Sequence, residues 1–188
     1  MRVAREAWEE HGVDGISVEE ICARAGVSRG TFYSYFYKKE HLVVFLLFYG
    51  ISIRWDDIEA LLASDRPTLA LCVEVVGLIA AKLRGFPKPI VLRGVEECFS
   101  QYGEMKERYG VARALSTYFE PIFERGIERG EVSPTWEGRL LSQAMSWMTL
   151  QGMFLWANGS LPDGELERNL RHRTNLIVAG ALAERAVD

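Results

Sequence analysis

Residues 17–42, SVEEICARAGVSRGTFYSYFYKKEHL, decide the fold of this chain. Ser17 and Glu20 form a predicted capping box, in which a hydroxyl and a carboxylate each accept a hydrogen bond from a free backbone amide at a helix start. Gly26 is expected to end that helix, because glycine adopts the left-handed conformation without strain. Ser28 then caps a second short helix. Two short helices joined by a tight glycine turn predict a helix-turn-helix, whose second helix enters the major groove of DNA.

The spacing of apolar residues predicts an all-α chain. A first helix is expected over residues 2–11, and Phe32 and Phe36 lie four positions apart, so that both rings face the core of a three-helix domain. Apolar residues recur at spacings of three and four along the rest of the chain, and long alternating β-branched runs are absent. We therefore expect a helix-turn-helix DNA-binding domain over residues 1–46 and a larger helical domain over residues 47–188.

Charge is distributed unevenly along the chain. The total of 22 Lys and Arg against 26 Asp and Glu gives a net charge of -4, so any affinity for nucleic acid must be local. Residues 21–39 contain no acid, whereas Arg24, Arg29, Lys38 and Lys39 are basic. In an acidic protein this segment predicts a local surface that faces an anion such as the DNA backbone.

Residues 17–21, 25–36 and 38–42 closely resemble the DNA-binding domain of the tetracycline-repressor (TetR) family, which implies double-stranded operator DNA as a partner. The family pattern usually has a few more residues, often basic, before the first helix, whereas Met1 falls inside the helix here. The resemblance places Arg29, Gly30 and Tyr33 near base edges, and a bidentate Arg29 contact to guanine is worth about 1–3 kcal/mol of discrimination. It places Ser28, Thr31, Tyr35 and Lys39 on phosphates, with Ser34 on the same polar side of the helix.

The remaining chain predicts further helices that end at segments rich in glycine and proline. One long helix over residues 38–63 is expected to link the two domains, and Pro121 is expected to kink or divide a later helix. The other predicted helices span residues 68–84, 89–102, 104–129, 134–157 and 163–185.

A homodimer is expected, because one helix-turn-helix contacts only a few base pairs. Large and small apolar residues on the last two helices, together with one glutamine, predict the interface, which resembles the four-helix dimer bundle of the family. On the first of these helices they are Leu140, Leu141, Ala144, Trp147, Met148, Gln151 and Leu155, and on the second Leu176, Ile177, Gly180 and Ala181.

Aromatic and soft side chains in the middle of the chain predict a cavity for an unidentified apolar or aromatic effector, although ordinary core packing explains each residue as well. Ligand binding would then change the separation of the two DNA-reading heads through the helix over residues 38–63. The candidate pocket residues are Trp55, Phe86, Phe99, Tyr102, Tyr118, Phe119, Phe123, Trp147, Met148 and Gln151.

The N-terminus and the apolar runs argue against export and membrane insertion. Arg2, Arg5 and Glu6 interrupt any apolar signal segment, and the apolar run over residues 42–53 is shorter than the ~20 residues of a membrane span. We expect a cytoplasmic protein without a membrane partner. The three cysteines sit at wide spacings in apolar stretches and are expected to be buried thiols.

Together, the resemblance, the expected dimer and the expected cavity predict a DNA-binding transcriptional repressor that a small apolar or aromatic ligand releases from its operator. Two other classes of function are alternatives to it. His11, His41 and His172 match no metal-ligand spacing, and the chain has no nucleophile elbow or phosphate loop, so catalysis is disfavoured and no cofactor or metal is expected. A helical module that binds a small molecule or a protein without binding DNA stays open as the alternative.

Overall fold

The computed structural model describes residues 2–100 and 111–182, and ten helices lie within these two ranges. The structure confirms the all-α fold class. We call α1 to α3 the head and α5 to α11 the body, and α4 joins the two. The helices are α1 (Arg2–His11), α2 (Val18–Ala25), α3 (Arg29–Tyr35), α4 (Lys39–Ile51), α5 (Trp55–Ala63), α6 (Thr68–Leu83), α7 (Lys88–Ser100), α9 (Val111–Glu128), α10 (Gly138–Ala157) and α11 (Leu166–Ala181).

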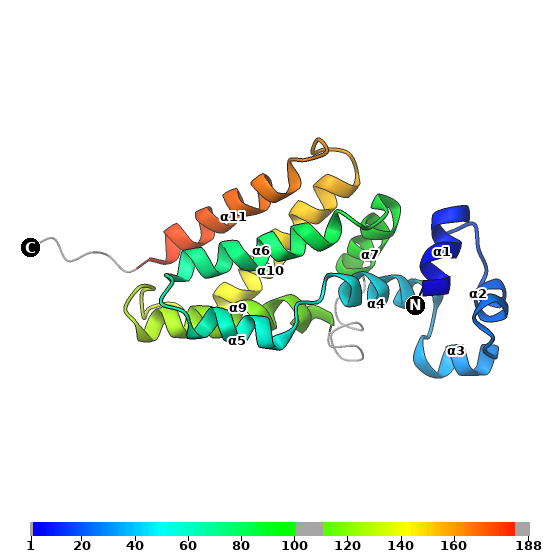
Figure 1. The fold of residues 1–188 in the computed structure, drawn as a ribbon, viewed down its shortest axis with the longest axis horizontal. Coiled ribbons are helices and arrows are strands. Elements are labelled where there is room, and N and C mark those ends of the chain that lie inside the picture. The colour runs from blue at the N-terminus through cyan, green and yellow to red at the C-terminus, as the bar shows by residue number, and fades with distance from the viewer. Residues whose placement is uncertain (1, 101–110, 183–188) are drawn as a thin grey trace, which may run out of the picture.

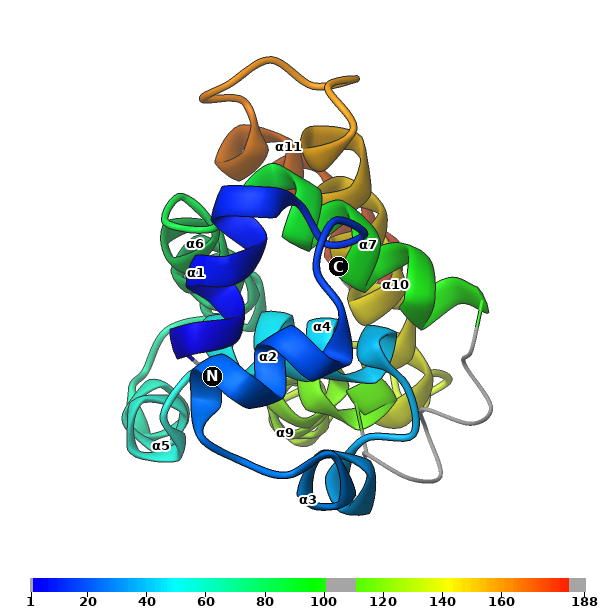
Figure 2. The same ribbon diagram turned by 90° about the vertical axis from the view of Figure 1, so that its right-hand side faces the viewer.

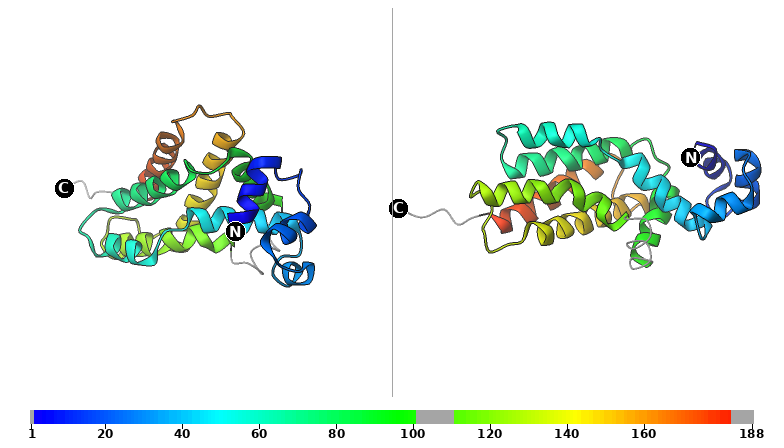
Figure 3. Two further views of the ribbon diagram at one scale, coloured as in Figure 1. Left: turned by 45° about the vertical axis from the view of Figure 1, so that its right-hand side comes forward. Right: turned by 90° about the horizontal axis from the view of Figure 1, so that it is seen from below.

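The molecule is elongated, with the head at one end and the C-terminal end of α11 toward the other (Figure 1). Within the body, α9 packs against α10, and α11 lies against both α6 and α10. Helix α7 lies at the end of the body that faces the head and packs against α4 and α10 (Figure 3). No helix in the described ranges is both long and apolar enough to cross a bilayer.

Local signals build the head as the sequence predicts. The Ser17 amide donates to Glu20 Oε2 at 2.9 Å, and the Glu20 amide donates to Ser17 Oγ at 3.2 Å, which completes the capping box of α2. Gly26 ends this helix with φ of 67°, in the left-handed region. Trp8, Ile21, Phe32 and other buried apolar side chains form the head core.

Helix α4 contributes to two hydrophobic cores at once. Leu42, Val43 and Leu46 are buried in the head core, whereas Val44 and Leu47 are buried in the body core. An amphipathic surface helix buries one stripe, but α4 buries eight of its residues between the two halves and leaves Phe45 and Tyr49 exposed. The position of the head on the body therefore depends on the packing of this helix.

The expectation of one helix over residues 38–63 is wrong, because α4 ends at Ile51 and α5 begins at Trp55. At the break, the Ile53 amide donates to the Tyr118 hydroxyl of α9 at 3.0 Å instead of to a helical carbonyl. The Ile53 side chain is buried in the body core. A tertiary contact therefore outweighs the local helical preference of this segment.

Three other boundaries differ from the expected ones. Helix α9 continues through Pro121, so of the two expected outcomes, a kink or a division, the division is absent. Helix α10 begins at Gly138 rather than at residue 134, because Ser133 and Thr135 form a hydrogen-bonded turn, with 2.8 Å between their hydroxyl oxygens. Helix α11 begins at Leu166. The start of the helix expected over residues 104–129 falls partly outside the described residues.

Glu131 caps the first turn of α6 from a distant part of the chain. Pro67 precedes α6 and offers no side-chain cap, and Glu131 Oε2 accepts from the Thr68 amide at 2.6 Å and from the Thr68 hydroxyl at 2.8 Å. Partial burial acts to raise the pKa of Glu131, but the bonds from Thr68 and the charge of Arg129 outweigh it and leave the pKa below its ordinary value.

We expect Glu131→Gln to lower the free energy of unfolding at neutral pH by about 1 kcal/mol, the usual size of a lost helix cap. A carboxyl whose folded-state pKa is depressed stabilises the fold above its unfolded pKa, and that stabilisation disappears as the pH falls through the folded value. The loss of unfolding free energy in Glu131→Gln should therefore be largest at pH 7 and smaller at about pH 3.5. Urea unfolding at both pH values measures it, with Glu128→Gln, an exposed residue of the same region, as the control. An equal loss of unfolding free energy at both pH values would show that the effect does not come from the charge of the Glu131 side chain.

Candidate nucleic-acid interface

Helix α3 lies at the outer edge of the head (Figure 2). Phe32 anchors it in the head core, with the ring of Phe36 5.5 Å away and the ring of Tyr33 edge-on at 5.3 Å. The other side chains of the helix leave the core and form one accessible polar surface. They are Arg29, Thr31, Tyr33, Ser34 and Tyr35, and Gly30 is exposed beside them.

Ser28 and Thr31 fix the start of this helix. Ser28 Oγ accepts from the Thr31 amide at 3.0 Å, and the hydroxyl oxygens of the two residues lie 2.9 Å apart. Ser34 donates its hydroxyl to the Thr31 carbonyl at 2.7 Å. A Cβ built on Gly30 would meet only Ser28 Oγ, at 3.6 Å, so no part of the described protein requires a glycine there. The surface around Gly30 is therefore open to a backbone from outside the chain.

Arg29 has an acidic partner in the folded protein. Its Nη1 lies 3.0 Å from Glu19 Oε1 of α2, and both side chains are more than half exposed. An exposed pair of this kind contributes little to stability and is easily exchanged for another partner. Arg29 must leave Glu19, or share it, before it contacts a base edge.

Arg24 is also paired, with Glu10 of α1 at 2.8 Å. The hydrogen bond and charge of Arg24 hold the pKa of Glu10 below its ordinary value. Residues 21–39 contain no acid, but in the folded chain carboxylates of α1 and α2 pair with the two arginines of this segment. The surface is less cationic than the local sequence alone predicts.

The two lysines before and at the start of α4 are tied to their own chain. Lys39 Nζ donates to the Ile16 carbonyl at 3.0 Å, which joins α4 to the turn before α2. Lys38 Nζ lies 3.5 Å from Glu97 of α7, and Arg93 lies 3.4 Å from the same nearly buried carboxylate. Lys38 thus links the segment after the recognition helix to the body.

The residues predicted to line one effector cavity occupy different environments. Phe119 and Phe123 are fully buried in the body core, and Trp55 is exposed on α5. Phe99 stacks on Trp147 with 5.4 Å between ring centroids. The Tyr118 hydroxyl accepts from the Ile53 amide, and Gln151 accepts from Arg173, which also approaches the Met148 sulfur. Tyr102 lies outside the described residues.

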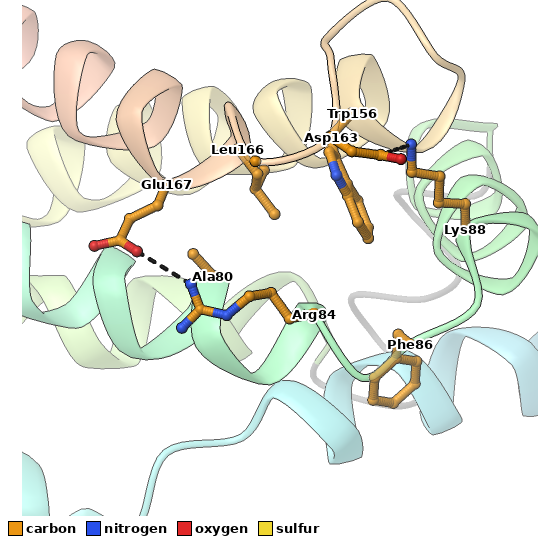
Figure 4. Close-up of a pocket in the computed structure, with 9 residues that line it drawn as sticks. Ala80, Arg84, Phe86, Lys88, Trp156, Asp163, Leu166 and Glu167 are labelled. Carbon is orange, nitrogen blue, oxygen red and sulfur yellow. Dashed lines mark hydrogen bonds and ion pairs between the residues drawn. The ribbon is translucent and has the colours of Figure 1, made fainter.

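Phe86 differs from the others because it lines two cavities. One, of about 440 Å³, lies among the ends of α6, α7, α10 and α11 and is lined by Ala80, Arg84, Phe86, Lys88, Trp156, Asp163, Gly164, Leu166 and Glu167 (Figure 4). The other, of about 400 Å³, lies between the head and the body and includes Arg2, Arg5, Leu46, Tyr49, Gly50, Lys82, Gly85 and Phe86. Within the described ranges, no cluster of three or more His, Cys, Asp or Glu has the arrangement of a metal site.

The outer surface of α10 and α11 carries apolar side chains that the body does not cover. Leu176 is 68% exposed and Leu140 is 52% exposed. A Cβ built on Gly180 would meet nothing within 4 Å, so a second helix has room to approach there. Leu141 and Ala181, which were expected on this surface, are instead buried in the core of their own chain.

Comparison with known proteins agrees with this geometry. The family model described as bacterial regulatory proteins, tetR family, matches residues 1–44. The N-terminal region belongs to the tetR family. The match confirms the resemblance seen in residues 17–42 and identifies α1 to α3 as a tetR-type helix-turn-helix. No curated protein matches the chain.

Solved structures extend the likeness to the whole tetR-family fold. A FadR repressor of Thermus thermophilus, described as a TetR-family transcriptional repressor in complex with lauroyl-CoA, is 21% identical, with a TM-score of 0.80 over 100% of this chain and 95% of that one. FadR of Bacillus subtilis in complex with stearoyl-CoA is 22% identical, with a TM-score of 0.67 over 95% and 96% of the two chains. Reduced NemR of E. coli is 19% identical, with a TM-score of 0.61 over 99% and 96%.

Sequence reasoning missed the carboxylates that face the predicted cations of the tetR-type head. The pairing of Glu19 with Arg29 could have been predicted from the sequence, because Glu19 lies in the first turn of α2 and α3 folds back beside that helix. The pairing of Glu97 with Lys38 could not have been predicted, because the two residues are 59 positions apart and meet only through the packing of α7 on α4.

We expect Ser28→Ala to destabilise α3 by about 1 kcal/mol, because the Thr31 amide loses its cap. Ser34→Ala is the matched control, since its hydroxyl donates to a carbonyl that is already placed in the helix. Hydrogen exchange of the α3 amides measures the difference. Equal protection in the two variants would show that the Ser28 bond does not hold the helix start.

Proposed function

We propose that this chain is a homodimeric, sequence-specific DNA-binding repressor that a small ligand with an apolar or aromatic part releases from its operator. The observation that carries the proposal is the exposed polar face of α3 on a tetR-type head. Residues 1–46 would form the DNA-binding domain and residues 47–188 the effector and dimerisation domain. A helical ligand-binding module without DNA binding is the competing function.

The N-terminal half of α3 is the part that would enter the major groove. Arg29, Gly30 and Tyr33 would lie near base edges, with Arg29 exchanging Glu19 for a guanine edge. Ser28, Thr31, Ser34, Tyr35 and Lys39 would border the phosphates. The contact between Lys39 and the Ile16 carbonyl would hold its ammonium group at the start of α4, beside the free amides of the first turn.

A dimer would place two copies of α3 on successive major grooves, about 34–36 Å apart or at a multiple of that spacing. The uncovered apolar surface of α10 and α11 is the candidate interface, because Leu140 and Leu176 lose water contact when a second copy covers them. A two-fold axis at this surface would bring each helix against its counterpart.

The effector class is proposed from two of the similar structures. The FadR proteins of Thermus thermophilus and Bacillus subtilis are complexes with lauroyl-CoA and stearoyl-CoA. We propose an effector of comparable chemistry, an acyl chain that carries an anionic group. Release of operator DNA by lauroyl-CoA tests this class directly.

A thiol-based signal has less support. Burial raises the pKa of both Cys72 and Cys98 to about 12, so that both groups stay protonated thiols at neutral pH. Oxidation and exchange need the thiolate, and buried thiols with raised pKa values are inert. Small-molecule binding is therefore favoured over oxidation of Cys72 or Cys98 as the releasing event.

We expect Arg29→Ala to relax base preference at one position of each half-site, because a lost base-edge contact removes about 1–3 kcal/mol of discrimination. Lys39→Ala should weaken binding to all sequences alike and reduce the slope of log K against log salt by about 0.9. Selection from random DNA, followed by gel shifts at several salt concentrations, measures both effects.

Both substitutions remove one positive charge, so each serves as the control for the other. Identical selected sequences and identical salt slopes for the two variants would contradict the division between base and phosphate contacts. A wild-type protein that binds no oligonucleotide at low salt would favour the competing function of a module without DNA binding.

Leu176→Glu should convert the dimer to monomer, because two unpaired carboxylates would be buried at the interface at a cost of about 3 kcal/mol or more. Sedimentation equilibrium measures the change. Trp55→Glu is the control, since Trp55 is also exposed and begins α5, where an acidic side chain is favourable. If Leu176→Glu remains as dimeric as Trp55→Glu, the interface lies elsewhere.

A further inference from the structure

We propose that the cavity beside residues 84–88 binds an amphipathic anion, a molecule with one negatively charged head group and an apolar remainder. We propose further that Phe86 transmits the binding of this ligand to the head. The regulatory part of this inference rests on the proposed function, whereas the binding part does not. The volume of about 440 Å³ is within the range of small-molecule sites.

The walls of the cavity suit the apolar part of such a ligand. Trp156 and Leu166 point from α10 and α11 toward the part of α6 that carries Ala80 (Figure 4). Phe86 lies on the side of the cavity that borders α4, where its ring meets Gly50. These side chains offer an aromatic and aliphatic surface that an acyl chain or a ring would cover, with a gain of about 25 cal/mol for each Å² removed from water.

The cavity lining contains two cations, Arg84 and Lys88, and two acids, Asp163 and Glu167, but Glu167 has a further cationic partner outside the lining. Glu167 is already held by Arg171, whose Nε and Nη2 both donate to Glu167 Oε1 at 3.0 and 2.8 Å. Arg84 approaches the other oxygen of Glu167 at 3.2 Å as a second cation. Lys88 pairs with Asp163. Because Arg171 pairs with Glu167 from outside the lining, Arg84 can leave Glu167 without leaving that carboxylate unpaired.

Arg84 is placed to receive a carboxylate or a phosphate. Its side chain is 64% exposed, so it can turn to a ligand without breaking buried contacts. A guanidinium binds planar oxyanions through paired hydrogen bonds, and Glu167 keeps Arg171 when Arg84 leaves. Charge complementarity therefore selects an anionic head group over a neutral one.

Phe86 connects this cavity to the head. The structure places its ring directly on the backbone of α4, because a Cβ added to Gly50 would lie 1.9 Å from the ring. Arg5 of α1 donates to the Gly85 carbonyl and lies 5.0 Å above the Phe86 ring. Phe86 also packs against both hydrophobic cores. A ligand that shifts residues 84–88 therefore acts on α1 and α4 together.

Calorimetric titration of the full chain with decanoate tests the site. Wild type should bind decanoate, and Arg84→Gln should raise the Kd by about tenfold, the lower end of the range for a hydrogen bond to a charged group. Arg168→Gln is the matched control, because Arg168 is exposed on α11, pairs with Glu165 and does not line the cavity. Decan-1-ol, which lacks the charge, should bind wild type and Arg84→Gln equally.

Equal Kd values for decanoate in wild type, Arg84→Gln and Arg168→Gln would overturn the site, as would the absence of decanoate binding to wild type. These titrations contain no DNA, so their result is independent of whether the chain binds an operator. Wild type that binds decanoate but no DNA would leave the site standing while the proposed function fails.

The coupling is tested with Arg5→Gln, which removes the contact with Gly85 and Phe86 without touching the cavity wall. This variant should bind decanoate as wild type does, while the ratio of operator affinities with and without decanoate moves toward one. An unchanged ratio in Arg5→Gln would refute the role of the Phe86 contact. The ratio is informative whatever the variant does to the affinity for DNA alone.

Discussion

Helix α4 must bury side chains in two cores at the same time, and the rest of the structure depends on this constraint. Val43 and Leu46 face the head core, while Val44 and Leu47 face the body core. A buried helix of this kind cannot rotate or slide without opening one of the two packed surfaces, because protein interiors tolerate few voids. The orientation of α3 relative to the body is therefore set by the packing of the head on α4 and by the short segment between α3 and α4.

Electrostatics adds a second constraint at the DNA-facing end. Arg24, Arg29 and Lys38 each meet a carboxylate in the folded chain. The pairs of Arg24 and Arg29 are exposed, so exchanging a carboxylate for a phosphate costs little there. The pair of Lys38 involves Glu97, which is nearly buried and also contacts Arg93. Releasing Lys38 to DNA would thus disturb a contact between α4 and α7, which links the head surface to the body.

The head could be predicted from sequence because its determinants are local. The capping box of Ser17 and Glu20, the left-handed Gly26 and the Ser28 cap each depend on residues within a few positions of one another. The break after Ile51 could not be predicted in this way, because it depends on the Tyr118 hydroxyl of α9. The same limit applies to the cap of α6 by Glu131 and to the cavity beside residues 84–88, which gathers side chains from four helices.

The break between α4 and α5 changes the route by which the body can influence the head. A continuous helix over residues 38–63 would carry a displacement along its axis, but residues 52–54 interrupt it. Within the described chain α4 still packs laterally against α6 and α9. Two further lateral contacts are the packing of α7 on α4 and the packing of Phe86 on Gly50. Both begin at or next to residues 84–88, since α7 starts at Lys88. A ligand that moves this short segment therefore acts on α4 from the side, close to the point where α4 holds the head.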